Sequence, residues 1–95
     1  MVVGTARIEL ILHGVSSLKD KRGIVKRVLH RVRDNFGISA AETALMDSHR
    51  QAEIGLAVVT NDARLADSIM QKAVNYVIDL HLAEVGRVET EVTHF

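Results

Sequence analysis

The chain contains no cysteine, and this absence excludes several kinds of chemistry at once. Without a thiol the protein has no disulfide, no thiolate metal ligand and no cysteine nucleophile. The absence also fits the reducing conditions of the cytoplasm, where we expect the protein to be located.

Aromatic residues and long apolar runs are also scarce. The aromatic residues are two Phe and one Tyr, with no Trp, and none falls on a central strand of the fold predicted below. RNA-recognition sheets stack bases on exposed aromatic side chains, so the sequence argues against that mode of binding. The apolar runs, such as residues 56–59, are far shorter than the ~20 residues that cross a bilayer. No signal-type segment opens the chain, and we expect no membrane association.

The formal net charge is zero, yet the charges are unevenly distributed. Residues 1–35 contain eight bases and three acids, a net +5, and residues 36–95 contain four bases and nine acids, a net −5. Seven of the bases lie between Ser16 and Arg33, where Asp20 is the single acid. A neutral but polarised domain is typical of proteins that offer one face to an anionic partner.

Apolar periodicity predicts alternating strands and helices in one domain, residues 1–95. The expected strands are 2–12, 38–47, 53–60 and 85–95. The expected helices are 17–36, capped by Ser17 and ended by Gly37, and a second that follows a cap at Asn61 or Asp62. The order βαββαβ predicts an α+β ferredoxin-like plait: a four-stranded antiparallel sheet, order 4-1-3-2, with two helices on one face.

Three- and four-residue spacings predict which helix residues face the core. In the first helix they are Ile24, Val25, Val28, Leu29, Val32 and Phe36. In the second helix they are Leu65, Ala66, Ile69, Ala73, Val77 and Leu80, which leaves Val74 and Ile78 outside the stripe. Residues 48–51 are the predicted hairpin turn.

The predicted topology gathers separated segments at one end of the sheet. These are the loop His13–Ser17, the start of the first helix, the turn at His49 and Arg50, and His81. We take this end as the candidate site.

Basic side chains are predicted to line the first helix beside its buried face. At ~100° per residue, Lys19, Arg22, Lys26, His30 and Arg33 form one stripe. Free N–H groups and the helix dipole at the N-terminus favour an anion at the same end. The predicted nucleic-acid-binding residues are Lys19, Lys21, Arg22, Lys26, Arg33 and Arg50, and the candidate anion site is Ser17, Lys19, Arg22 and His49. The alternative is a solvated surface whose basic stems cover the edge of the core.

No catalytic or metal-binding constellation stands out. Asp47, Ser48 and His49 are hydrolytic residue types, but adjacent positions on a turn do not give a nucleophile–base–orienter geometry. The five histidines show no close ligand spacing, although His13, His49 and His81 at one end leave a metal or small-molecule site open. We therefore expect no catalytic residue, no metal and no cofactor.

Small residues in the predicted sheet suit association with another chain. They are Ala40, Ala41, Ala44, Gly55 and Ala57, and Val74 and Ile78 are the apolar residues outside the second helix's stripe. We take a homodimer as an expected partner interaction.

Several segments together resemble the YlxP-like family of small bacterial proteins. They are His13, the segment Ser17-Leu18-Lys19-Asp20-Lys21-Arg22, Val25-Lys26, Arg31 and Arg33, Asn35-Phe36, Asp47 and Gly55-Leu56-Ala57-Val58-Val59. His49 stands where the family often has tryptophan. The resemblance implies a ferredoxin-like fold and a cytoplasmic bacterial protein whose genes neighbour those of translation initiation and ribosome maturation. It thus implies ribosomal RNA or the small ribosomal subunit as partner of a non-enzymatic accessory factor. The alternative function is a homo-oligomeric or protein-partner-binding scaffold.

Overall fold

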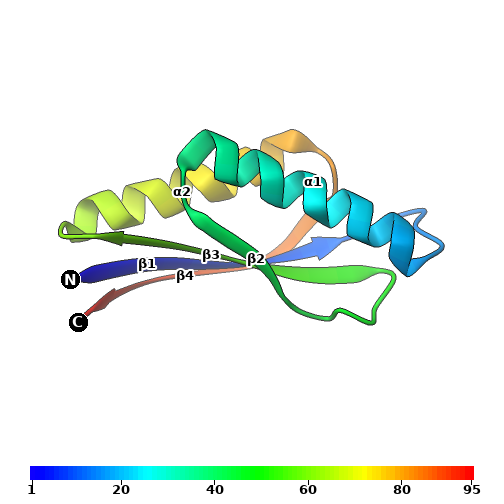
Figure 1. The fold of residues 1–95 in the computed structure, drawn as a ribbon, viewed down its shortest axis with the longest axis horizontal. Helices are drawn as coiled ribbons and strands as arrows, with labels where there is room; N and C mark the ends of the chain where they lie inside the picture. Colours follow the sequence, from blue (N-terminus) through cyan, green and yellow to red (C-terminus); the bar gives the residue numbers. More distant parts are fainter.

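The computed structural model describes all 95 residues as one α+β domain with the predicted order of elements. The elements are β1 (Val2–Ile11), α1 (Leu18–Phe36), β2 (Ser39–Ala44), β3 (Gln51–Thr60), α2 (Ala63–Leu80) and β4 (Glu84–His94). The sheet is antiparallel with the order β2-β3-β1-β4, which is the predicted 4-1-3-2 counted from the other edge. Both helices cover one face of the sheet and leave the other face open (Figure 1).

Short polar residues and a glycine set the helix ends. The Ser17 side chain accepts a hydrogen bond from the backbone N–H of Asp20 at 3.1 Å, as an N-cap residue does. Gly37 ends α1 in the left-handed region, at φ 61°, where the missing Cβ removes the steric penalty. Asp62 caps α2. The predicted caps at Ser17, Gly37 and Asp62 are confirmed.

The core lies between the sheet and the two helices. Residues Ile8 and Ile54 are directly paired on the central strands β1 and β3, and both are fully buried. Val25, Val28 and Val32 of α1 belong to the same buried cluster. The period of two in the strands therefore meets the period of about 3.6 in the helix at one apolar layer.

Helix α2 presents a face that differs from the predicted one. Leu65 is 49% exposed, whereas Met70 and Val74 are 1% and 6% exposed. The cause is a close approach at Gly4 of β1, where an added Cβ would lie 3.1 Å from the Ala66 Cβ and 3.2 Å from the Met70 Cγ. This contact fixes the rotation of α2 and turns Leu65 outward.

The β2–β3 connection is longer than predicted. Strand β2 ends at Ala44, the loop takes residues 45–50, and β3 begins at Gln51. The register between β2 and β3 shifts between Glu42 and Ala44, and Leu45 has a left-handed φ of 63°. These two features stop the ladder before the predicted turn at residues 48–51. The hairpin loop is defined below as residues 45–50.

The rotation of α2 can be tested by two truncations. Met70→Ala should lower the free energy of unfolding by about 2–5 kcal/mol, because it removes a fully buried side chain. Leu65→Ala should change it by about 0.5 kcal/mol or less, because half of that side chain is already in water. Urea denaturation of both variants measures the difference. A larger loss for Leu65→Ala than for Met70→Ala would contradict the observed helix rotation.

Candidate functional site

Helix α1 carries six exposed bases that have no acidic partner. Its exposed Lys and Arg side chains, with no carboxylate oxygen within 4.0 Å, are Lys19, Arg22, Lys26, Arg27, Arg31 and Arg33. We call this set the basic face of α1. Elsewhere, Arg7 and Arg87 on the sheet each lie within 4.0 Å of a glutamate, whereas Arg50, Arg64 and Lys72 do not. The positive charge of α1 is thus left unneutralised within the domain.

The basic face extends along most of the helix. From Lys19 to Arg33 the rise is ~21 Å at 1.5 Å per residue. The Nη2 of Arg33 donates to the carbonyl oxygen of Ala40 at 2.5 Å, which anchors the guanidinium without neutralising it. His30 of the predicted stripe instead pairs with Asp34 at 3.1 Å.

Arg27 and Arg31 belong to the basic face but not to the predicted stripe. They lie on the other side of the exposed surface of α1 from Lys19 and Arg22. The predicted stripe covers only one side of the exposed surface and therefore leaves these two residues out. The high density of bases between Ser16 and Arg33 was the sequence signal that could have included them.

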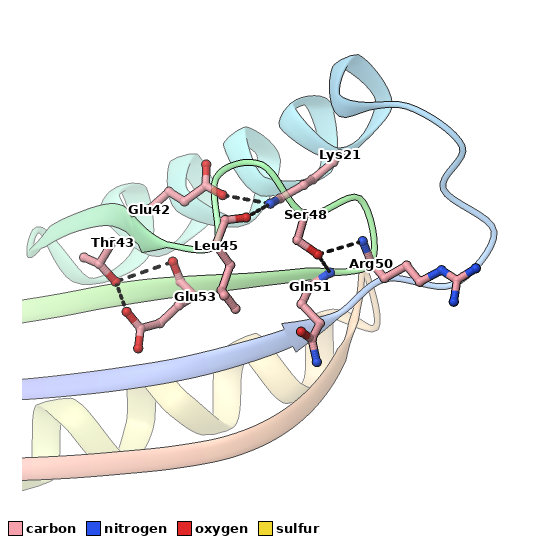
Figure 2. Close-up of polar contacts among 8 residues, drawn as sticks. All are labelled: Lys21, Glu42, Thr43, Leu45, Ser48, Arg50, Gln51 and Glu53. Carbon is pink, nitrogen blue, oxygen red and sulfur yellow. Dashed lines mark hydrogen bonds and ion pairs between the residues drawn. The ribbon is translucent and has the colours of Figure 1, made fainter.

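Lys21, predicted to bind nucleic acid, is not on the surface. Its side chain is 1% exposed, and its Nζ donates to the carbonyl oxygen of Leu45 at 2.5 Å. Figure 2 shows the side chain reaching from α1 towards the hairpin loop, between Leu45 and Glu42. Lys21 falls on the buried side of α1, in line with Val25 and Val28, so the prediction was wrong for this residue.

The partner of Lys21 is Glu42 on β2. The Nζ lies 3.3 Å from the Glu42 Oε2, and the Glu42 side chain is 20% exposed. That oxygen is buried and accepts no hydrogen bond, so the contact is a charge pair without hydrogen-bond alignment. Removal of either partner would leave the other charge poorly solvated.

The predicted gathering of loops at one end is confirmed in part. A common open hollow of about 1100 Å³ is lined by residues 11–16, from the end of β1 into the next loop, and by residues 47–51, from the hairpin loop to the start of β3. The backbone N–H of Leu12 donates to the carbonyl oxygen of Arg50 at 2.8 Å and joins the two segments. His13, His49 and Arg50 border this hollow, and His81 does not.

The candidate anion site therefore consists of two neighbouring parts. His49 and Arg50 are exposed beside the hollow, and Arg50 extends away from the hairpin loop (Figure 2). Ser17, Lys19 and Arg22 follow on α1, just beyond the lining residue Ser16. Ser17 is already engaged as the helix cap, so the exposed cations are the groups free to contact an anion.

The side chains with catalytic potential at this end have other partners. The His13 Nε2 lies 2.7 Å from a carboxylate oxygen of Glu84. The Ser48 hydroxyl accepts hydrogen bonds from the backbone N–H groups of Arg50 and Gln51 and shapes the loop (Figure 2). No group of three or more His, Asp or Glu residues is placed to hold a metal ion.

Neither helix combines the length and the apolar character that crossing a bilayer requires.

Comparison with solved structures defines a ferredoxin-like domain. A de novo designed protein with ferredoxin fold matches with a TM-score of 0.56 at 15% identity, covering 100% of this chain and 87% of that one. Acylphosphatase from Bacillus subtilis matches with a TM-score of 0.57 at 16% identity, covering 100% and 88%. At these identities the likeness shows the fold alone.

Comparison of sequences shows the family. Residues 3–90 match the family described as "Protein of unknown function (DUF503)". The chain is 29% identical over 76 residues to the "Uncharacterized protein YlxP" of Bacillus subtilis (strain 168), covering 80% of this chain and 83% of that protein. The chain therefore belongs to the DUF503 family, and the predicted YlxP-like resemblance is confirmed.

The structural role of Lys21 can be tested by removing its charge. Lys21→Ala should lower the free energy of unfolding by about 3 kcal/mol, because it leaves the Glu42 carboxylate without its partner and opens space in the core. Lys21→Met combined with Glu42→Gln should restore most of the loss, since no buried charge remains. Urea denaturation measures both, with Lys26→Ala as the exposed control. A loss for Lys26→Ala equal to that for Lys21→Ala would contradict the burial of Lys21.

Proposed function

We propose that this protein is a non-enzymatic accessory factor that binds the phosphate backbone of ribosomal RNA, as part of the small subunit or of an assembly intermediate. The basic face of α1 makes the main contacts in this proposal. His49 and Arg50 add contacts at the end where the helix begins.

The observation that carries the proposal is the concentration of unpaired bases on α1: of the nine Lys and Arg residues without an acidic partner, six lie on this helix. Outside α1, Arg7 and Arg87 on the sheet are paired with glutamates, and the three unpaired bases are spread over the hairpin loop and α2. Six bases on one helix without such balance repel one another, at a cost to the isolated domain. Phosphates remove that repulsion, and each contact releases condensed counterions.

The arrangement of the other elements favours backbone contact over base readout. Two of the three aromatic residues, Phe36 and Tyr76, stack edge-to-face between α1 and α2 with ring centroids 5.5 Å apart. The Tyr76 hydroxyl lies 2.6 Å from the Asn35 Nδ2. Their rings are thus committed to helix packing. Along the open face of the sheet, glutamates outnumber arginines, which disfavours nucleic acid there.

A double charge reversal tests the binding surface. Lys19→Glu with Arg22→Glu should abolish co-sedimentation of the purified protein with small ribosomal subunits at low salt, because four units of charge change at the start of the basic face. The matched control is Arg64→Glu with Lys72→Glu, which changes the charge equally on exposed positions of α2. The control should co-sediment like the wild type.

Either of two outcomes would overturn the proposal. One is wild-type protein that stays at the top of the gradient at every salt concentration. The other is equal loss in the α1 and α2 variants, which would indicate a response to net charge alone. Association that survives nuclease treatment of the subunits would instead indicate a protein partner for the basic face.

Salt dependence gives an independent measure of the number of phosphate contacts. If all six bases contact single-stranded RNA, the slope of log K against log salt concentration should be roughly −4, at about 0.7 per phosphate. Lys26→Gln should make the slope shallower by about 0.7, the value of one phosphate contact, and weaken binding to all sequences alike. Fluorescence anisotropy with a labelled ribosomal RNA fragment measures both. A slope near zero would contradict phosphate contact.

A further inference from the structure

The two edges of the sheet differ in how well they are protected from another chain. Strand β2 is short, with six residues, and Arg33 donates a hydrogen bond to the carbonyl oxygen of Ala40 in this strand. Strand β4 has eleven residues, pairs with β1 on one side and has no strand on its other side. Figure 1 shows β4 along the border of the sheet. A long edge strand with unpaired backbone groups is a template for pairing with a further strand.

The middle of β4 has opposite charges on one side of the sheet and an apolar side chain on the other. Arg87 and Glu89 are exposed on the open side, and the Arg87 Nη1 lies 3.8 Å from the Glu89 Oε1. Val88 lies between them and is paired with the buried Ile8 of β1, so it faces the helix side. The Val88 residue is 36% exposed, because the helices cover this edge only in part.

Ile78 of α2 is a second exposed apolar residue beside this edge. Helix α1 contacts β2, whereas α2 contacts β4. The Tyr76 ring packs on Phe36 of α1 and so marks the side of α2 that faces α1. Ile78 follows two residues later, about 200° further round the helix, and is therefore directed towards the β4 edge. It is 40% exposed.

Ile78 also lies near the level of Val88 along the sheet. Gly4 of β1 approaches Met70 of α2 and is paired with Val92 of β4, which fixes one level. From Val92 to Val88 the strand covers ~13 Å, and a helix rises as far in about nine residues, close to the separation of Met70 and Ile78. The two apolar side chains thus form one exposed patch on the helix side of the edge.

We propose that β4 pairs with β4 of a second copy of this chain, antiparallel, about a two-fold axis that passes through Val88 perpendicular to the sheet. The two sheets then form one continuous sheet. On its open side, each Arg87 faces the partner's Glu89. On its helix side, the Val88 and Ile78 side chains of both copies meet at the axis. A self-complementary pattern of this kind is what an isologous interface requires.

The charges of β4 select this register. An axis at Glu89 would set the two Glu89 carboxylates opposite each other, and an axis at Thr90 would set Glu89 opposite the partner's Glu91. An axis at Arg87 would set the two guanidinium groups opposite each other. Charges on an edge strand commonly discourage pairing, but about Val88 each charge faces its opposite, which stabilises cross-strand pairs.

The pairing that this axis gives is short and well defined. The register of β4 with β1 shifts between Val88 and Val85, so the regular ladder covers residues 86–90 and leaves Glu91 outside it. Glu89 also lies 3.8 Å from Arg7, which adds a cation on its other side. The basic face of α1 lies over the β2 side of the sheet and stays exposed in the dimer. Failure of either proposal therefore leaves the other standing.

The test is the oligomeric state of the full chain, measured by sedimentation equilibrium from low-micromolar to submillimolar concentration. The wild type should form a dimer. Arg87→Glu and Glu89→Arg, each alone, should weaken it at least about tenfold, because like charges then face each other across the axis. The control is Lys72→Glu, which changes the charge as much as Arg87→Glu does. Lys72 is exposed about one turn before Tyr76, away from β4, and its variant should dimerise like the wild type.

A mixture of the two charge variants tests the register. The Arg87→Glu chain and the Glu89→Arg chain should together form a heterodimer of about wild-type affinity, because each charge again faces its opposite in the other copy. Each of these chains has lost its own pair between positions 87 and 89, so the recovery cannot arise within one chain. Circular dichroism establishes that each variant is folded.

A pair of lysine substitutions on α2 tests the contact on the helix side. Ile78→Lys should weaken the dimer at least about tenfold, because it brings two ammonium groups together near the axis. Leu65→Lys is the matched control, since Leu65 is exposed about three turns before Tyr76 and shares its direction away from β4. A wild type that stays monomeric, a dimer insensitive to Arg87→Glu or Ile78→Lys, an equal loss in either control, or a mixture without recovery would each overturn the proposal.

Discussion

The buried ammonium of Lys21 holds the basic helix in its orientation. It ties the start of α1 to β2 through Glu42 and to the hairpin loop through the carbonyl oxygen of Leu45. Because Lys21 points towards the core, the periodicity of the helix directs Lys19, Arg22 and Lys26 towards solvent. A buried pair of this kind adds little net stability, because desolvation offsets most of the attraction. Its effect is positional: it places the start of the basic face beside the hairpin loop.

The order of elements, the sheet topology and the helix caps could be predicted because each depends on local pattern. Alternation in β1 and the Ser17 cap are examples. The burial of Lys21 could also have been predicted, because Lys21 lies on the same helix face as Val25, Val28 and Val32. Its residue type, a lysine in a segment with seven bases, instead predicted a surface position. The prediction that Leu65 faces the core was wrong for another reason. Helix α2 has two overlapping apolar stripes, and packing against other elements, including the close contact of Met70 with Gly4, selects between them.

The candidate site was less predictable than the fold because it depends on partners from other elements. The pattern of bases predicted which residues lie on α1, but not which of them have an acidic partner. Glu42 had a local signal, since it follows the buried Ala40 by two residues and so points inward on β2. The pairing of His13 with Glu84 had none, because it depends on how the loop after β1 meets the start of β4.

The one-sided packing of the helices separates two surfaces of opposite charge. The basic face of α1 lies on the helix side of the sheet, and the glutamates lie on the open side. In the proposed complex, RNA approaches α1 from the helix side, and the acidic open face is directed away from the phosphates. The same one-sided packing that builds the core therefore also keeps the repulsive glutamates away from the proposed RNA contacts.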